Sequence, residues 1–449
     1  MKTAWLLPRG SSCHPSSCPS CYVHFALAIV LLTSLTGCTT SPSSTDAARM
    51  EACLPSFPDE DGWFGGDAAF SVPLNPSSTP GVAHPNPSKP RPEVSLWFFG
   101  DSFVARNTQA SPSRGRVYPF VHNAVARSSC SESGEWQIDY AWDEGTKPQA
   151  FFKPDPNAPW VKRAIAEAGS APYYWPLAPF VLEDVLYVGL LRVHPAVASG
   201  PFNLPFRLVG ADLAQIQNPA DPPEQWAVDI LPLTDQGVAI PGSAWVAESD
   251  FVYAFTYING AEGRTPQILT RLPQSELRRW PTDLARHIET LGLDGEWIPG
   301  LRPDHATRLM EDDATEMSVH YSPHAESWLA VYSDPTPASQ QAQKGILWLR
   351  RAKTLAGPWS EPFRLAVVPE QRRGSHAAED PTVFCYAGKA HPQFGAADEL
   401  VMTYVCNLYA RTEKEIPETL ERLLENPGIY RPQVMRIKIP STVKNEPEP

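Results

Sequence analysis

The feature of this 449-residue chain that most limits its fold is a pair of strand-like segments that recurs five times. In each pair, an apolar segment and a short polar turn precede a second segment in which large residues alternate, a pattern that predicts a β-hairpin. The five first segments are 67–74, 176–182, 243–248, 315–321 and 380–386. The five second segments begin 66 to 89 residues apart and are 96–101, 185–190, 251–257, 328–333 and 400–405.

Five such hairpins predict an all-β protein, and radial repetition of the unit favours a five-bladed β-propeller. A β-sandwich is the alternative, but it would not repeat one hairpin five times. The 49 prolines indicate long loop insertions, because proline is excluded from helix interiors and central strands. Only 160–168 and 275–291 have a helical pattern, so one or two short helices would decorate the fold. A last strand at 433–439 is expected to help close the ring beside the first blade.

The N-terminal region has the pattern of an export signal. Lys2 and Arg9 precede an apolar run at 25–32 that is too short to span a bilayer. The run leads to Leu35-Thr-Gly-Cys38, which resembles the bacterial lipobox, where the cysteine becomes lipidated. An ordinary secretory peptide is the alternative. We therefore expect an exported protein of the cell envelope, on the outer membrane if the source has one. The expected parts are a lipoprotein signal peptide (1–37), a flexible tether that begins at the lipidated Cys38 (38–60), a propeller (61–440) and a disordered tail (441–449).

Charge and motifs exclude several classes of function. A net charge of −13 without Lys/Arg clusters argues against binding to nucleic acid or to an anionic membrane surface. The fingerprints of serine hydrolases, P-loop proteins and dinucleotide-binding proteins are missing from the sequence. The histidines lack the spacing of a metal site. We expect a monomer without cofactor or metal, attached to the membrane only through its lipid anchor.

Four cysteines follow the lipobox cysteine: Cys53, Cys130, Cys385 and Cys406. An even number in an exported chain permits two disulfides. Cys385 and Cys406 fall on neighbouring predicted strands, so they are the favoured pair, and Cys53 would pair with Cys130 by default. The alternative is that the cysteines are free and buried as small apolar residues.

Two aspartates are the candidate catalytic residues. Asp67 begins the first segment of the first hairpin and Asp101 ends the second, so antiparallel pairing would bring them to the same rim. Opposed side chains of neighbouring strands lie about 4.5–5.5 Å apart, which is close to the carboxylate separation of a retaining glycosidase. The alternative is that each aspartate only caps a turn beside its glycine.

The same geometry brings residues of the other hairpins to this rim. Carboxylates and exposed aromatic rings suit a sugar site, because rings stack on sugar faces while carboxylates bond hydroxyl groups. Glu316 is the alternative acid. The segment 173–175 could form a stacking platform or could simply pack between blades. The expected rim residues are Trp175, Ser243, Glu316, Asp334, Glu379, Asp380 and Asn407.

These motifs together resemble a known family. Gly62-Trp-Phe-Gly-Gly-Asp67 and Leu96-Trp-Phe-Phe-Gly-Asp101 are similar to motifs of a bacterial domain family of unknown function. Some of its members are five-bladed propeller endo-D-arabinanases. The similarity spans roughly 60–440. Weaker matches are 174–176, 315–321, 390–392 and 404–407.

The resemblance implies that Asp67 and Asp101 are the catalytic carboxylates of a retaining mechanism. It also implies that Trp175, Glu316, His391 and Asn407 bind substrate. The long insertion between the two Asp motifs departs from the family pattern, and so does Gln393, where an acid is expected. The leading hypothesis is a cell-surface glycoside hydrolase that acts on an arabinan-like or other furanoside-containing polysaccharide. The alternative is a non-catalytic surface lipoprotein that binds a glycan or a protein.

Overall fold

The computed structural model describes only part of the chain. It covers residues 53–74, 94–105, 120–131, 134–145, 147–199, 204–259, 264–334, 345–372, 374–410 and 412–440, which all belong to one compact unit, Ser43–Pro449. The predicted signal peptide, Cys38, most of the tether, the insertion at 75–93 and the tail lie outside the described residues. None of the helices within those ranges is both long and apolar enough to cross a membrane.

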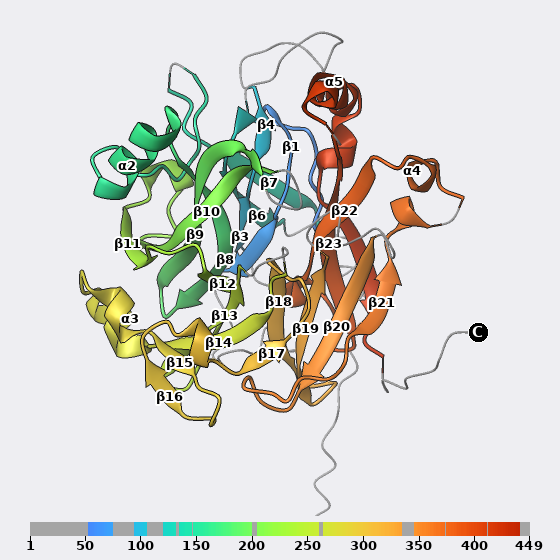
Figure 1. Ribbon diagram of the computed structural model, residues 1–449. Helices are drawn as coiled ribbons and strands as arrows, with labels where there is room; N and C mark the ends of the chain where they lie inside the picture. The colour runs from blue at the N-terminus through green and yellow to red at the C-terminus, as the bar shows by residue number, and fades with distance from the viewer. Residues whose placement is uncertain are drawn as a thin grey trace, which may run out of the picture. The chain divides into compact units, whose positions relative to one another are not determined.

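All five predicted hairpins are present, and each opens an antiparallel sheet (Figure 1). In the first sheet the strands are β2 (Phe70–Pro73), β3 (Val94–Phe99), β6 (Ala124–Cys130) and β7 (Trp136–Ala141). In the second sheet they are β8 (Tyr173–Leu182), β9 (Val185–Ser199), β10 (Leu204–Ile216) and β11 (Val228–Thr234).

The third sheet is the largest, since the short β17 pairs with β14 beside the main path. Its strands are β12 (Ala239–Glu248), β13 (Phe251–Ile258), β14 (Gln267–Pro273), β15 (Glu289–Leu291), β16 (Trp297–Pro299) and β17 (Arg308–Met310). The fourth sheet consists of β18 (Met317–Ser322), β19 (Ser327–Ser333), β20 (Ile346–Ala352) and β21 (Phe363–Val367). The fifth sheet consists of β22 (Val383–Ala390), β23 (Glu399–Leu408) and β24 (Gln433–Lys438).

A small additional sheet was not predicted. It joins β1 (Trp63–Gly66), β4 (Ser102–Val104) and β5 (Phe120–Val121). The strands β1 and β4 flank the two Gly-Asp motifs and pair antiparallel, with Gly66 opposite Ser102. This pairing holds the two motifs together from outside the first sheet.

Helices are few, but they exceed the prediction. α2 (Pro159–Ala168) matches the expected 160–168 and ends at Gly169, whose φ of 69° is the left-handed cap that glycine favours. The prediction of a helix over 275–291 is only partly confirmed, because α3 (Gln274–Arg279) ends where Pro281 follows the left-handed Trp280. The rest of that stretch contains a 3₁₀ turn and the strand β15. Two helices were not predicted, α4 (His376–Glu379) and α5 (Ile416–Glu425). The 3₁₀ turns are η1 (Pro223–Gln225), η3 (Leu284–His287), η4 (Pro303–His305), η5 (Pro369–Gln371), η6 (Pro392–Phe394), η7 (Glu413–Glu415) and η8 (Pro427–Tyr430).

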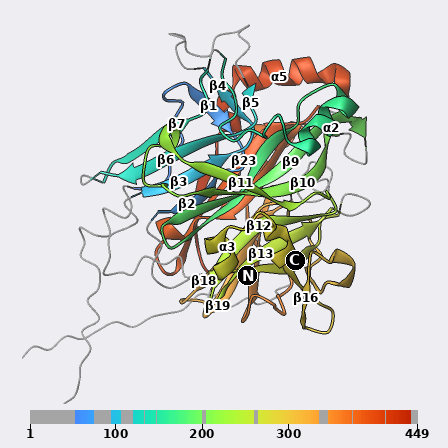
Figure 2. The ribbon, with the colours of Figure 1, turned by 90° about the vertical axis from the view of Figure 1, so that its left-hand side faces the viewer.

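The first strands of the five sheets follow one another in a cyclic order. β2 contacts β8, β8 contacts β12, β12 contacts β18, and β18 contacts β22. The order returns to its start where Lys389 Nζ donates to the Ala68 carbonyl and Gln393 Nε2 donates to Ser71 Oγ at 2.7 Å. In Figures 1 and 2 the last sheet lies beside the first strands of the chain. The fold is therefore all-β, with the last sheet against the first.

Three of these first strands contain a bulge. The register shifts after Pro176 in β8, after Pro241 in β12 and after Tyr386 in β22. In the first sheet, Ala68 and Ala69 have φ values of 62° and 56° just before β2. Bulges and left-handed residues re-aim neighbouring side chains and are frequent beside active sites.

Both predicted disulfides are present, Cys53–Cys130 and Cys385–Cys406. Cys53 and Phe57 lie in the segment expected to be a tether, yet both are buried. The Phe57 ring packs edge-on against Trp97, with centroids 4.9 Å apart. The last part of that segment therefore covers the core of the first sheet, because its apolar side chains gain from burial.

The last predicted strand is also present. β24 pairs with β23 as the third strand of the fifth sheet. Its Val434 packs against the apolar cluster that contains Trp63 and Trp97. The C-terminal strand thus lies next to the first sheet, as expected.

Candidate active site

A backbone hydrogen bond joins Asp67 directly to Asp101. The Asp67 N–H donates to the Asp101 carbonyl at 3.2 Å, and the Gly100 N–H donates to the Asp67 carbonyl at 3.1 Å. A side chain at position 100 would collide with Asp67 Oδ1, which explains the glycine there. The two aspartates therefore lie side by side, as the antiparallel hairpin predicted.

The surroundings of Asp67 raise the pKa of its carboxyl group. Burial and the charges of Asp101 and Glu316 raise its pKa to about 8. Hydrogen bonds from two tyrosines, Tyr386 and Tyr430, act in the opposite direction. The Tyr386 hydroxyl donates to Asp67 Oδ2 at 2.7 Å. The pKa of Asp67 therefore lies well above the ordinary aspartate value, and its carboxyl group keeps its proton to higher pH than an exposed aspartate does.

Asp101 has a different environment. Its Oδ1 accepts a hydrogen bond from Trp175 Nε1 at 2.8 Å and lies 3.0 Å from His122 Nδ1, which donates to it in the tautomer with the proton on Nδ1. The His122 ring stacks on Tyr173, with centroids 3.5 Å apart. The Asp101 side chain is 20% exposed. Two N–H donors on one oxygen suit an ionised carboxylate, and the Oδ2 oxygen receives neither of these bonds.

A buried ion pair lies beside Asp67. Lys389 Nζ donates to Glu316 Oε2 at 2.8 Å, and also to the carbonyls of Ala68 and Ala387. The lysine side chain is 2% exposed and the glutamate side chain 23%. Burial lowers the pKa of Lys389, while the charge of Glu316 opposes that shift. The pair connects the fourth and fifth sheets to the first.

Asn407 joins the same group through a tyrosine. Its side chain lowers the pKa of Tyr386, whose hydroxyl donates to Asp67. Of the residues predicted to act in catalysis or to bind substrate, the structure therefore brings together Asp67, Asp101, Trp175, Glu316 and Asn407.

The two other predicted residues have structural positions. His391 is 1% exposed, and its ring nitrogens bond Ser71 Oγ at 2.6 Å and Thr403 Oγ1 at 2.7 Å. It lies between the first and last sheets and is bonded to both. Asp380 accepts from the Thr382 N–H and hydroxyl and pairs with Arg422, and these bonds lower its pKa. It stabilises the turn before β22.

Sequence reasoning missed four residues that contact the two aspartates or their partners: His122, Lys389, Tyr386 and Tyr430. His122 follows the insertion after Asp101, and Tyr430 lies in a 3₁₀ turn before the last strand, so neither belongs to a repeated hairpin. Tyr386 and Lys389 belong to a predicted hairpin or follow it directly. The bulge after Tyr386 changes the alternation that would have assigned them to a face.

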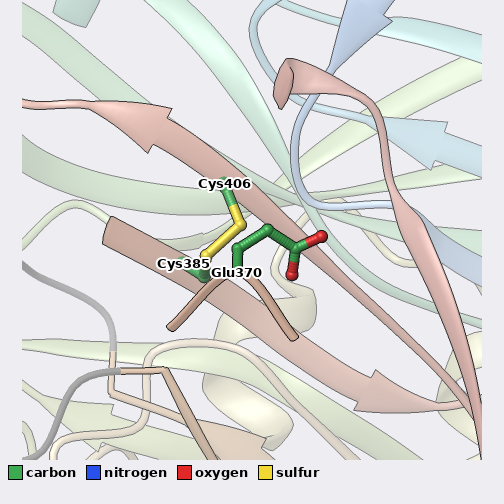
Figure 3. A group of neighbouring side chains, drawn as sticks. All are labelled: Glu370, Cys385 and Cys406. Atoms are coloured by element: carbon green, nitrogen blue, oxygen red, sulfur yellow. A yellow bond between two sulfur atoms is a disulfide. The ribbon is translucent and has the colours of Figure 1, made fainter. Parts of the chain in front are cut away.

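One group of possible metal ligands occurs among the described residues. Ligand atoms of Glu370, Cys385 and Cys406 lie within 4.8 Å of one another. Figure 3 shows that the two sulfur atoms form a disulfide beside the Glu370 carboxylate. Disulfide sulfurs offer no thiolate, so this group does not fit a metal ion.

Comparison with solved structures supports the fold. A "putative hydrolase" from Bacteroides ovatus is 16% identical and aligns with 87% of this chain and 88% of its own, with a TM-score of 0.56. An alpha-L-arabinanase mutant from Cellvibrio cellulosa (11% identity, 83% and 91% coverage) has a TM-score of 0.40. An alpha-L-arabinofuranosidase from Lactobacillus brevis (9% identity, 85% and 92% coverage) has a TM-score of 0.42. Of these three, only the first is similar enough to show a shared fold.

Comparison of sequences gives the family. No curated protein matches the chain. A family profile matches residues 56–439, nearly all of the part with the recurring hairpins. The resemblance noted in the two Gly-Asp motifs is thereby confirmed. The chain belongs to the family described as the domain of unknown function DUF5005.

Proposed function

We propose that the five sheets are the blades of a five-bladed β-propeller, and that the protein is a glycoside hydrolase. The cyclic order of β2, β8, β12, β18 and β22 supports the propeller, because radial repetition brings the first strand of each blade against its neighbours. The proposed substrate is an arabinan-like or other furanoside-containing polysaccharide, which follows from the family resemblance.

The observation that carries the enzymatic proposal is the contrast between two adjacent carboxyl groups. The pKa of Asp67 is raised to about 8, whereas one oxygen of Asp101 lies within hydrogen-bond distance of the Trp175 and His122 ring nitrogens. A pair of carboxyl groups in such different environments is how glycosidases separate the acid from the ionised partner. We assign Asp67 as the general acid and Asp101 as the ionised carboxylate.

The proposed reaction retains the configuration of the sugar. Opposed residues of antiparallel strands have side chains about 4.5–5.5 Å apart, which suits a nucleophile rather than a base acting through water. The Asp101 carboxylate attacks the anomeric carbon while Asp67 protonates the departing glycosidic oxygen, and the bond from this carbon to that oxygen breaks. Asp67 then takes a proton from water, and the resulting hydroxide displaces Asp101.

Aromatic side chains beside Asp101 support a sugar substrate. Phe120 is 43% exposed, and its ring lies 5.6 Å from that of His122. Trp175 and Tyr173 are half-buried and contact each other edge-on. Rings of this kind stack on sugar faces. In the proposal, Trp175 also orients Asp101, Glu316 bonds a sugar hydroxyl and Asn407 acts through Tyr386.

The test is incubation of the purified protein with a panel of polysaccharides, followed by NMR of the first anomer released. Asp67→Asn and Asp101→Asn should each lower kcat by about 10³-fold or more. Asp139→Asn, an exposed residue of β7, is the control and should leave kcat unchanged. Full activity in a folded Asp67 or Asp101 variant would overturn the assignment, and an inverted product would exclude the retaining route.

A non-catalytic glycan-binding protein is the alternative function. It would bind one of the polysaccharides and release no product, and Asp67→Asn would then alter affinity only. The exposed ring of Phe120 suits binding as well as catalysis. Calorimetric titration with a bound polysaccharide, combined with the product assay, separates the two functions.

We further propose that the protein is exported to the cell envelope through the lipobox and anchored at Cys38. The two disulfides support an oxidising compartment, since such bonds are rare in the cytosol. Cys38→Ser should move the protein from the membrane fraction to the soluble fraction. Unchanged membrane association would contradict lipidation.

A further inference from the structure

The Cys385–Cys406 disulfide lies between two residues of the candidate active site. Cys385 and Cys406 are directly opposite each other in the register of β22 and β23. Tyr386 follows the first cysteine and Asn407 follows the second. Because successive side chains of a strand point to opposite faces, Tyr386 and Asn407 share the face opposite the disulfide. They are diagonal neighbours on either side of the bridged pair.

Tyr386 lies between Asn407 and Asp67. The Asn407 side chain lowers the pKa of the Tyr386 phenol, as an amide N–H directed at the phenol oxygen would, and Asn407 Oδ1 accepts the Leu408 N–H at 2.7 Å. The Tyr386 hydroxyl then donates to Asp67 Oδ2 at 2.7 Å. Burial and the adjacent Asp67 charge raise the pKa of Tyr386 well above 10, so the phenol keeps the proton it donates.

Tyr386 is the last residue of β22 before a bulge in the ladder. The pairing of β22 with β23 is regular up to Tyr386 and Val405, and then the register shifts before Lys389. Beyond Tyr386 the backbone is therefore held by the bulge rather than by regular pairs. The disulfide, one residue before Tyr386, supplies a covalent link at the end of the regular ladder.

We propose that Tyr386 is a positioning residue for Asp67, and that the Cys385–Cys406 disulfide fixes it in place together with Asn407. The inference rests on the proposed function, in which Asp67 is the general acid. Tyr386 holds the acid by one oxygen and limits how tightly it binds its proton. The disulfide then influences catalysis because it positions Tyr386 against Asp67, in addition to any effect on the stability of the fold.

Several charged or titratable groups face Asp67, and the proposal concerns one of them. Asp101 approaches from the end of β3, Glu316 from the start of β18, Lys389 from β22 and Tyr430 from η8. All of these are unchanged in Tyr386→Phe, which removes only the donor hydroxyl. Since a donor to a carboxylate stabilises the ionised form, its loss should raise the pKa of Asp67.

The test is a carboxyl ¹³C NMR titration of the full protein labelled at aspartate, with the Asp67 signal assigned by Asp67→Asn. Tyr386→Phe should raise the Asp67 pKa by about one to two, as expected for loss of a hydrogen bond to a charged group. Tyr332→Phe is the matched control, because that hydroxyl donates to Asp312 Oδ2 at 2.7 Å in the fourth sheet. It should leave the Asp67 titration unchanged.

The disulfide is tested with the same signal. Cys385→Ser/Cys406→Ser should raise the Asp67 pKa in the same direction as Tyr386→Phe, whereas Cys53→Ser/Cys130→Ser should not. If Tyr386→Phe does not fold, Asn407→Ala with the same titration decides the matter. An unchanged Asp67 titration in folded Tyr386→Phe or Asn407→Ala would overturn the proposal.

The titration also separates this proposal from the proposed function, because it needs no substrate. A raised Asp67 pKa without any hydrolysis would reject the glycosidase and keep the positioning role. With a hydrolysed substrate, the basic limb of the kcat profile should move to higher pH in Tyr386→Phe. A change of KM alone, with the limb unmoved, would contradict a role on the acid.

Discussion

At the scale of single residues, the candidate site is defined by how its protons are held. Asp67 and Asp101 have the same side chain, yet one is beside two tyrosines and Glu316 while the other accepts N–H bonds from an indole and an imidazole. The difference arises from neighbours contributed by three other sheets and the small additional sheet. Because this environment favours the protonated carboxyl group of Asp67, ionisation of Asp67 lowers the free energy of unfolding of the protein.

The first prediction concerns the stability of Asp67→Asn across pH. The folded pKa of about 8 lies above the ordinary value of 3.8, so the wild type binds an extra proton between these values and loses stability as pH rises through them. The variant has no such loss. Its Tm relative to wild type should therefore increase between pH 4 and 9, by roughly 1–2 °C for each kcal/mol relieved.

Scanning calorimetry at several pH values measures this difference, with Asp139→Asn as the control that should show a constant offset. A Tm difference for Asp67→Asn that does not change between pH 4 and 9 would contradict the raised pKa. The result is independent of catalysis, so it tests the environment of Asp67 alone.

At the scale of elements, the hairpins could be predicted because their signal is local. Alternation within a segment and a short turn identify β8 with β9, or β18 with β19, without knowledge of the rest of the chain. The proximity of Asp67 and Asp101 followed from the same logic. The small sheet of β1, β4 and β5 could not be predicted, since its strands are two to four residues long and join across an insertion.

The hydrogen-bond partners and the burial of the predicted site residues could not be predicted from the sequence either. Trp175 was predicted to bind substrate, but the hydrogen bond from its indole N–H to Asp101 was not predicted. His391 was expected near substrate, but it is buried between sheets. Such partners come from segments far apart in the chain, and their distances depend on how the sheets pack. Hairpin patterns carry no information about that packing.

The second prediction concerns the ion pair that connects three sheets. Lys389→Met removes a buried cation and leaves Glu316 and the carbonyls of Ala68 and Ala387 without its bonds. Breaking a buried pair costs about 3–5 kcal/mol, so the urea midpoint should fall strongly. Glu316→Gln should cost less, because that side chain is partly exposed and its amide oxygen still accepts from the lysine.

The matched control is Lys438→Met, which removes an exposed pair with Asp398. Such a pair contributes about 0–1 kcal/mol. Equal losses of stability in Lys389→Met and Lys438→Met would show that the buried pair does not join the sheets. The comparison uses the free energy of unfolding from urea titrations at one pH.

At the scale of the whole molecule, the closure between the last and first sheets is made by polar side chains. Bonds to residues between Asp67 and Ser71 come from β22 and from the turn that follows it, through Tyr386, Lys389, His391 and Gln393. The candidate site lies at one end of this closure. A substitution that weakens the contact between the two sheets should therefore change both the free energy of unfolding and the pKa of Asp67.

The third prediction follows from the neutral His391. Burial and the nearby Lys389 charge hold its pKa well below 6.5, so the unfolded chain binds a proton that the folded protein does not. The stability that depends on the neutral ring is present above pH 6.5 and is lost as pH falls below it.

His391→Gln can still bond Ser71 or Thr403 and has no proton to gain. Its Tm should be lower than that of the wild type at pH 8, and the gap should narrow toward pH 5. The double difference between the two proteins removes the opposite contribution of Asp67, which both retain. A gap that stays constant or widens on acidification would show that His391 does not titrate as a buried neutral group of this closure.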